Sequence, residues 1–160
     1  MCENPGVPKK RESNHRLDHS RFVVPPDSKR VRIADHDPAY TGGFASKSDA
    51  KDALRDDIVR LSDAQELLWA TKEFSLLIVL QAMDAAGKDG TIKHVLRGIN
   101  PQGCSVHAFG PPSDEERLHH FLWRPVRFLP ERGRIAIFNR SYYEEVLVVR
   151  VHPRWLDKQW

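Results

Sequence analysis

The sequence predicts an α/β fold in which helices flank a parallel sheet. Three apolar runs, at residues 75–81, 104–109 and 134–139, have the length and composition of buried strands. Amphipathic stretches with helical spacing lie before and between these runs. Strands that alternate with helices along one chain are typical of a parallel sheet, because each helix carries the chain back to the start of the next strand.

The chain has two parts of different composition. Residues 1–45 are polar, charged and rich in proline, which predicts a basic, irregular N-terminal arm rather than a folded domain. Residues 46–160 contain the apolar runs and are predicted to form the folded domain. Gly42 and Gly43 indicate a turn just before that domain.

The first helix is expected over residues 48–70, where apolar residues recur at helical spacing and Ser46 or Ser48 can cap the first turn. The first of the three apolar runs follows and is predicted to be a strand buried on both faces, because it is apolar throughout. A second helix is expected over residues 88–97, and Gly98 is placed to end it.

The later elements also show boundary signals. Ser113 and Glu116 have capping-box spacing, which predicts the start of a third helix, and Pro125 is expected to end or kink it. Residues 142–151 are expected to begin as a helix, against the preference of their valines.

The composition narrows the possible functions. The chain has 25 basic and 22 acidic residues, and a net charge of +3 does not call for a nucleic-acid partner. Cys2 and Cys104 have no CxxC spacing, so neither a zinc site nor a disulfide framework is expected. Because there is no signal-peptide pattern and no apolar run of spanning length, we expect a cytoplasmic protein without a membrane partner.

One stretch has the pattern of a phosphate-binding loop. In LLIVLQAMDAAGKDGTIKHVL, an apolar strand leads into small residues, then Gly87 and Lys88, then an amphipathic helix. Small residues let backbone N–H groups approach phosphate oxygens, while the helix N-terminus and the lysine add positive charge. Ala82 replaces the first glycine of the Walker A pattern and Asp89 replaces its Ser or Thr. The alternative is therefore an ordinary strand-to-helix turn with a surface lysine.

Asp84 lies inside this loop. A carboxylate there would repel phosphate unless a cation lay between them, which predicts a magnesium ion held by Asp84 directly or through water. Magnesium is thus the expected cofactor. The alternative is an aspartate that forms an Asx turn.

Polar side chains also follow the third apolar run. Asn139 and Arg140 come at its carboxyl end. Ligands of an open α/β sheet bind beyond the carboxyl ends of its strands, so Asn139 and Arg140 share one pocket with the loop if the two strands are neighbours. Arg140 would then neutralise charge on a transferring phosphoryl group, or else pair at the surface with Glu144 or Glu145. Glu144 is either a metal-side carboxylate or a helix-start charge.

Together these motifs resemble one known family. The resemblance is to polyphosphate kinases of the second family and covers residues 33–155. It is carried, in order and spacing, by DHDPAYTGGFASKSDAK, AMDAAGKDGTIKHV, GINPQG, FLWR and GRIAIFNRSYYEEVLVVRVHP. The MDAAGKDG and NRS sequences resemble the class III subgroup, which accepts both AMP and ADP.

The resemblance implies a homo-oligomeric P-loop kinase that uses magnesium to move phosphoryl groups between polyphosphate and AMP, ADP or ATP. Its Walker B-like motif corresponds to Asn139, Arg140 and Ser141. Many relatives carry Asp in place of Asn139, which shifts the metal role toward Asp84. Arg124 is a possible phosphate contact by resemblance only. The phosphate-binding residues would be Ala85, Ala86, Gly87, Lys88, Asp89, Gly90, Thr91, Asn139 and Arg140.

Asp84, Lys88 and Arg140 are the candidate catalytic residues. The family continues beyond this length with a basic helical lid and the last strands of the sheet, so residues 46–160 are expected to be a partial P-loop kinase domain. The strand before the phosphate loop is central in such kinases, which would leave one of its edges open here. Two alternatives remain, namely another P-loop kinase that uses ATP, and an inactive phosphate-binding fragment that lacks the lid.

Overall fold

The computed structural model describes residues 19–24, 26, 31–83 and 85–152. The chain divides into two compact units, Met1–Arg55 and Asp56–Trp160. In the first unit, the described residues form two short 3₁₀ turns, η1 (His19–Phe22) and η2 (Ile33–Asp35). The predicted boundary between arm and domain, at residues 45 and 46, stays a prediction.

The first helix, α1 (Lys47–Thr71), lies within one residue of its predicted bounds at both ends. The hydroxyl of Ser46 accepts a hydrogen bond of 3.1 Å from the N–H of Asp49, so Ser46 rather than Ser48 caps the helix. The helix begins in the first unit and ends in the second.

The second unit contains a parallel sheet of three strands, β1 (Leu76–Leu80), β2 (Cys104–Ala108) and β3 (Ile135–Asn139). Their order is β1-β3-β2, and Leu80 and Ala108 are both in register with Asn139. The predicted α/β class and the three predicted strands are confirmed. All three carboxyl ends therefore meet at one edge of the sheet.

The burial of β1 differs from the prediction. We expected a strand buried on both faces, but Leu76 is 44% exposed and the rest of β1 is half-buried. The physical reason is that β1 pairs only with β3 among the described residues, so its other edge has no neighbouring strand. The central strand is β3, and its first four residues are the most completely buried run of the sheet.

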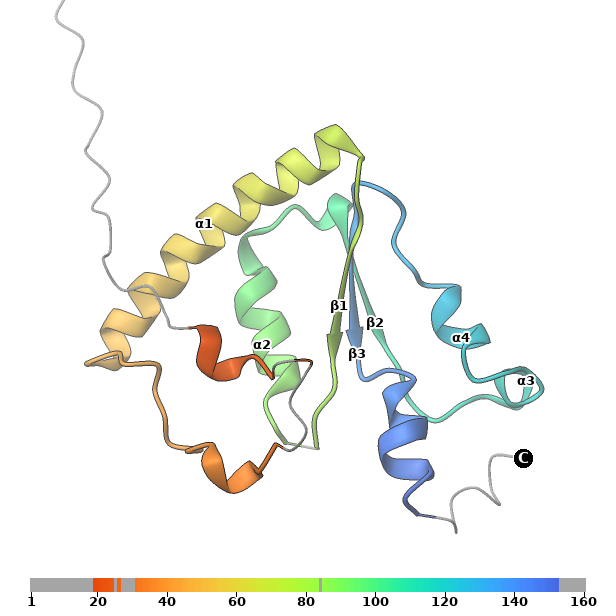
Figure 1. Cartoon of the computed structure of the whole chain (residues 1–160). Coiled ribbons are helices and arrows are strands. Elements are labelled where there is room, and N and C mark those ends of the chain that lie inside the picture. The colour runs from red at the N-terminus through yellow and green to blue at the C-terminus, as the bar shows by residue number, and fades with distance from the viewer. Residues whose placement is uncertain (1–18, 25, 27–30, 84, 153–160) are drawn as a thin grey trace, which may run out of the picture. The chain divides into compact units, whose positions relative to one another are not determined.

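Helices cover both faces of this sheet. Figure 1 shows α2 (Lys88–Val95) on one side and the short helices α3 (Asp114–Arg117) and α4 (Trp123–Val126) on the other. On the second face, the rings of Phe109 and Phe138 meet edge to face with centroids 4.9 Å apart. Two 3₁₀ turns, η3 (Leu96–Gly98) and η4 (Pro101–Gly103), connect α2 to β2.

A buried glutamine joins α1 to the connection before β2. Gln65 is 2% exposed, and its amide exchanges two hydrogen bonds of 2.8 Å with the backbone of Asn100. Because both amide groups are paired, the burial of this polar side chain costs little. Gly103 allows the close approach, since a Cβ there would lie 2.6 Å from the Gln65 Nε2.

The third predicted helix is shorter than expected. The capping box is present, because the Ser113 hydroxyl accepts from the Glu116 N–H and the Glu116 side chain accepts from the Ser113 N–H. However, α3 ends at Arg117, well before Pro125. Pro125 instead lies inside the separate helix α4, where a first-turn proline is tolerated because its missing N–H has no helical acceptor to lose.

The segment after β3 begins as a turn and continues as the π-helix η5 (Glu145–Val149). The N–H of Arg150 donates to the carbonyl of Glu145, five residues earlier, at 3.1 Å. The expected helical start is thus present with wider spacing than that of an α-helix. Among the described residues, no helix has both the length and the apolar content to cross a membrane.

Candidate functional site

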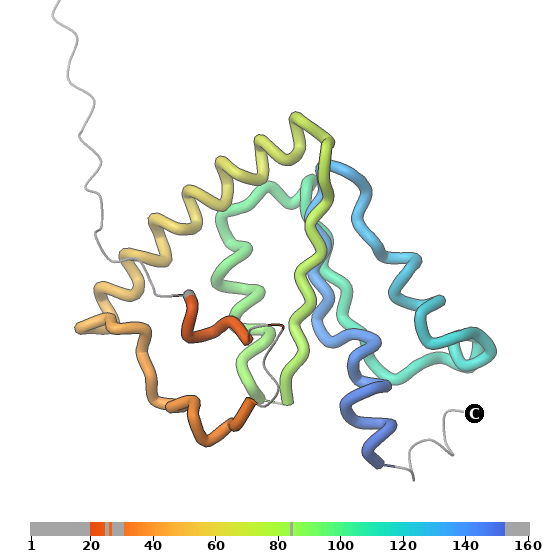
Figure 2. Tube along the Cα trace, in the orientation of Figure 1, coloured from red at the N-terminus to blue at the C-terminus, as the bar shows by residue number. Residues whose placement is uncertain are grey.

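The phosphate loop predicted from the sequence connects β1 to α2. Figure 2 shows the chain descending along β1, turning at the foot of the sheet and rising into α2. Two loop residues have left-handed backbones, Ala85 with φ of 62° and Gly87 with φ of 87°. Left-handed residues in a turn can direct backbone N–H groups toward an anion. The N–H of Ala86 is the exception in this loop, because it donates to the carbonyl of Met83 at 3.2 Å. Gly87 caps α2 with no side chain, which leaves the first amides of the helix open to a ligand.

Lys88 is the first residue of α2 and lies back over the loop. Its ammonium donates two hydrogen bonds of 2.8 Å, to the carbonyls of Ala82 and Met83. The ammonium is therefore held against the loop by the loop's own backbone. Phosphate binding by this loop stays a prediction.

The first turn of α2 is joined to the end of β3. The Nδ2 of Asn139 donates to the Oδ1 of Asp89 at 2.6 Å. The Thr91 hydroxyl donates to the carbonyl of Gly87 at 3.1 Å, so it stabilises the helix start. The loop and the Asn139 segment therefore adjoin one another, as the sequence predicted for the case that the two strands are neighbours.

Arg140 follows β3 with a backbone φ of 66°. A non-glycine residue in this region is strained and persists only where its surroundings hold it there. The N–H of Arg140 donates to the carbonyl of Leu80 at 3.0 Å, which fastens it to the end of β1. The backbone of Arg140 therefore lies at the edge of the sheet where the phosphate loop begins.

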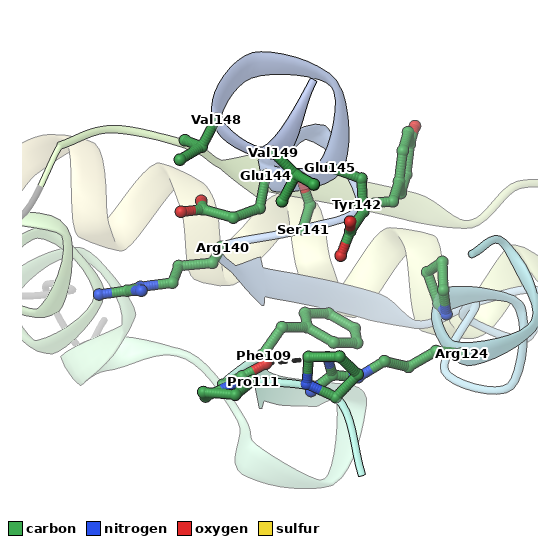
Figure 3. A pocket seen from close by; sticks show the side chains of 13 residues that line it. Phe109, Pro111, Arg124, Arg140, Ser141, Tyr142, Glu144, Glu145, Val148 and Val149 are labelled. Carbon is green, nitrogen blue, oxygen red and sulfur yellow. Dashed lines mark hydrogen bonds between the residues drawn. The ribbon is translucent and has the colours of Figure 1, made fainter. Parts of the chain in front are cut away.

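Two neighbouring cavities open at this edge. The first has a volume of about 530 Å³ and is lined by the phosphate loop, the end of β2 and the end of β3. The second, of about 190 Å³, lies between Arg124, Arg140 and the segment that leads into η5, as shown in Figure 3. Arg140 lines both cavities, together with residues 109–111.

Arg124 lies in the wall of the second cavity. Its Nε is 3.0 Å from the Oε1 of Glu116, and its Nη1 donates to the carbonyl of Gly110 at 2.9 Å. Its guanidinium also lies 5.0 Å from the centre of the Phe109 ring. These contacts hold the β2–α3 connection in place. The predicted phosphate contact of Arg124 stays a prediction.

Glu144 accepts a hydrogen bond of 2.6 Å from the Nε2 of Gln81, the residue that follows β1. The two roles predicted for Glu144, a metal-side carboxylate and a helix-start charge, did not include this hydrogen bond to Gln81.

In the segment after β3, a side-chain hydrogen bond to Tyr143 raises the pKa of Tyr142, with smaller contributions from burial and from the charge of Tyr143. In β2, burial raises the pKa of the Cys104 thiol.

The predicted metal ligand Asp84 lies outside the described residues. Within the described part of the chain, no three His, Cys, Asp or Glu side chains gather as a metal site. One donor does fit magnesium. The Oδ1 of Asn139 is buried without a hydrogen-bond donor among the described residues, and an amide oxygen is a ligand that Mg²⁺ accepts. The lack of charge on Asn139 had shifted the predicted metal role toward Asp84. Its amide oxygen, unpaired among the described residues, makes Asn139 a suitable second ligand.

Sequence reasoning missed two polar residues around this site, Gln81 and Glu116. Gln81 is the only polar residue in its apolar run after the initial serine, and it stands at the carboxyl end, which is the signal that marks it. Glu116 was identified as a capping residue, but its second role as the partner of Arg124 depends on the fold.

The chain belongs to the polyphosphate kinase 2 family, because the family's model matches residues 44–160, more than half of the chain. The sheet and its helices have the P-loop kinase-like fold of solved relatives. The crystal structure of polyphosphate kinase 2 from Arthrobacter aurescens TC1 superposes with a TM-score of 0.73 at 39% identity, covering 82% of this chain and 50% of that one. The resemblance recognised in the sequence is confirmed.

Two curated relatives have names that describe an activity. An ADP-polyphosphate phosphotransferase of Rhodopseudomonas palustris is 59% identical over 116 residues, which are 72% of this chain and 40% of that protein. An AMP/ADP-polyphosphate phosphotransferase of Meiothermus ruber is 46% identical over 132 residues, which are 82% of this chain and 49% of that protein. The chain thus spans less than half the length of either relative.

Proposed function

We propose that the chain carries the phosphate-binding site of a kinase that transfers phosphoryl groups between polyphosphate and AMP or ADP. The observation that carries this proposal is the single cavity lined by the phosphate loop, Lys88, Asn139 and Arg140. Family membership and the names of the two curated relatives support the choice of polyphosphate and a nucleotide as substrates.

The chemistry proposed for the site is phosphoryl transfer. The bond between the terminal phosphorus of polyphosphate and its bridging oxygen breaks, and a bond forms from that phosphorus to a terminal phosphate oxygen of the nucleotide. AMP becomes ADP, or ADP becomes ATP, and the polyphosphate leaves shorter by one phosphate. Such transfers depend on positioning and on neutralising charge, which the loop amides, Lys88 and Arg140 are placed to supply.

We propose magnesium as the cofactor, held by Asp84 and the Oδ1 of Asn139. A magnesium ion held there would supply positive charge beside the phosphate groups. Asn139 also donates to Asp89, which fixes the plane of its amide and directs the oxygen to the other side.

Replacing Asp84 with asparagine is expected to weaken magnesium-dependent binding of polyphosphate about tenfold or more, because one charged ligand is lost. Binding without magnesium should change much less, since the loop amides and Lys88 remain. Titration calorimetry with and without Mg²⁺ measures both, and Asp63→Asn on the exposed surface of α1 controls for the lost charge. Equal weakening under the two conditions would show that Asp84 acts without a metal.

Other aspects of the proposal follow from the substrates and the family. Free nucleotides are cytoplasmic metabolites, so we place the activity in the cytoplasm. The family resemblance leads us to propose a homo-oligomer, which the mass of the protein in solution tests.

The deciding experiment supplies polyphosphate and AMP or ADP without any ATP. Formation of ADP or ATP in step with loss of polyphosphate is the expected result. A requirement for ATP as donor would favour another P-loop kinase. Tight polyphosphate binding without any product would favour a phosphate-binding fragment that does not turn over.

A further inference from the structure

We propose that Gln81 is a positioning residue that fastens the stem of the phosphate loop to the turn that carries Arg140. The inference rests on the proposed function, because it assigns Gln81 the task of holding two parts of the transfer site at a fixed spacing. Gln81 itself lines neither of the two cavities, so it acts through the residues that it holds.

Gln81 makes two side-chain hydrogen bonds across the end of the sheet. Its Nε2 donates to the Oε2 of Glu144 at 2.6 Å, and its Oε1 accepts from the hydroxyl of Ser141 at 3.2 Å. The Ser141 hydroxyl also accepts from the N–H of Tyr143 at 3.1 Å. These groups are partly buried, and Ser141 is only 4% exposed, so each bond is protected from competition with water.

These bonds begin where the backbone pairing of the sheet stops. Leu80 and Asn139 are the last residues in register between β1 and β3, and the Arg140 N–H makes one more bond to the Leu80 carbonyl. Beyond that point the Gln81 side chain continues the connection between the two segments. It thereby helps to hold the left-handed backbone of Arg140, which persists only where its surroundings fix it.

The connection reaches the lysine as well. Gln81 immediately precedes Ala82, whose carbonyl accepts a hydrogen bond from the Lys88 ammonium. Movement of Gln81 away from the Ser141 turn would shift this carbonyl and the charge that it orients. The distance between Lys88 and Arg140 is therefore coupled to the Gln81 contacts.

Glutamine is the residue type that these partners require. The side chain must donate to a carboxylate and accept from a hydroxyl at the same time. An ionised glutamate cannot donate, a leucine can do neither, and an asparagine is one methylene shorter. A glutamate at position 81 would also place a second carboxylate against Glu144, which repels it.

A reciprocal exchange tests the inference. Gln81→Glu should lower kcat for polyphosphate-dependent transfer about tenfold or more with a smaller change in KM, because the reacting groups are misplaced. Glu144→Gln alone keeps a hydrogen bond with Gln81, and its kcat is the reference for the double variant because it carries any direct effect of the lost Glu144 charge. The double variant Gln81→Glu/Glu144→Gln restores the donor and the acceptor in reversed order, so its kcat should return to within about threefold of that of Glu144→Gln. Gln102→Glu, at an exposed glutamine before β2, is the matched control.

Hydrogen exchange of the Tyr143 amide is measured on the same proteins, with their melting temperatures. Faster exchange in Gln81→Glu and recovery in the double variant are expected, because this amide donates to the Ser141 hydroxyl. Equal kcat in Gln81→Glu and wild type, or a double variant as slow as Gln81→Glu, would overturn the inference. A wild-type protein that transfers nothing would instead overturn the proposed function, and amide exchange would then still decide whether Gln81 fastens the turn.

Discussion

Replacing Lys88 with alanine is expected to weaken the binding of polyphosphate about 10- to 100-fold. This is the usual loss of affinity when a charged hydrogen-bond donor to an anion is removed. The ammonium is already fixed over the loop by the carbonyls of Ala82 and Met83, so it is positioned before any ligand arrives. The alanine variant loses the charge and also releases the stem of the loop. Both effects act in the same direction on affinity.

Titration calorimetry with a polyphosphate of defined length measures this loss. Lys93→Ala is the matched control, because it removes the same charge from an exposed position on the same helix. Its effect should be small and should fade as salt is raised, as expected for a screened surface charge. Far-ultraviolet circular dichroism should be unchanged in both variants. Affinity for Lys88→Ala equal to that for Lys93→Ala would place the phosphate site elsewhere.

Much of the candidate site was predictable because its signals are local. A strand, a run of small residues and a helix start are contiguous in the chain, so a phosphate loop could be predicted without knowledge of the fold. The position of Arg140 relative to the loop required one further condition, that the two strands be neighbours. The pairing of β1 with β3 satisfies that condition.

The parts that the sequence did not reveal depend on contacts between distant residues. Gln81 and Glu144 are far apart in the chain, and so are Gln65 and Asn100, and no local pattern marks a pair of this kind. The central position of β3 also had no signal of its own, because three apolar runs of similar length leave the strand order undetermined. The prediction that Pro125 ends or kinks the third helix was wrong for a related reason. A proline is compatible with the first turn of a helix as well as with an end, and only the fold decides between them.

The second large effect is expected at Arg140. Replacing Arg140 with alanine should reduce polyphosphate-dependent transfer by about 10² to 10³, the usual loss when one group that stabilises transition-state charge is removed. Arg140 lines both the phosphate-loop cavity and the cavity beside it, so it adjoins the two spaces that we propose for the donor and the acceptor. Initial rates at saturating polyphosphate and nucleotide measure the effect.

Arg140→Gly separates the chemical role from a structural one. The backbone at this position has a φ of 66°, which glycine adopts freely and which costs other residues about 1 kcal/mol. Arg140→Gly should therefore melt at or above the temperature of Arg140→Ala, while transfer is lost equally in both. Arg134→Ala is the control at the opposite end of β3, where the arginine donates to the Gln102 carbonyl and lies 5.2 Å from the centre of the Trp69 ring. That variant should lose stability and keep its transfer rate. If Arg140→Gly instead unfolded at a much lower temperature and still transferred phosphoryl groups normally, Arg140 would be part of the fold and not of the chemistry.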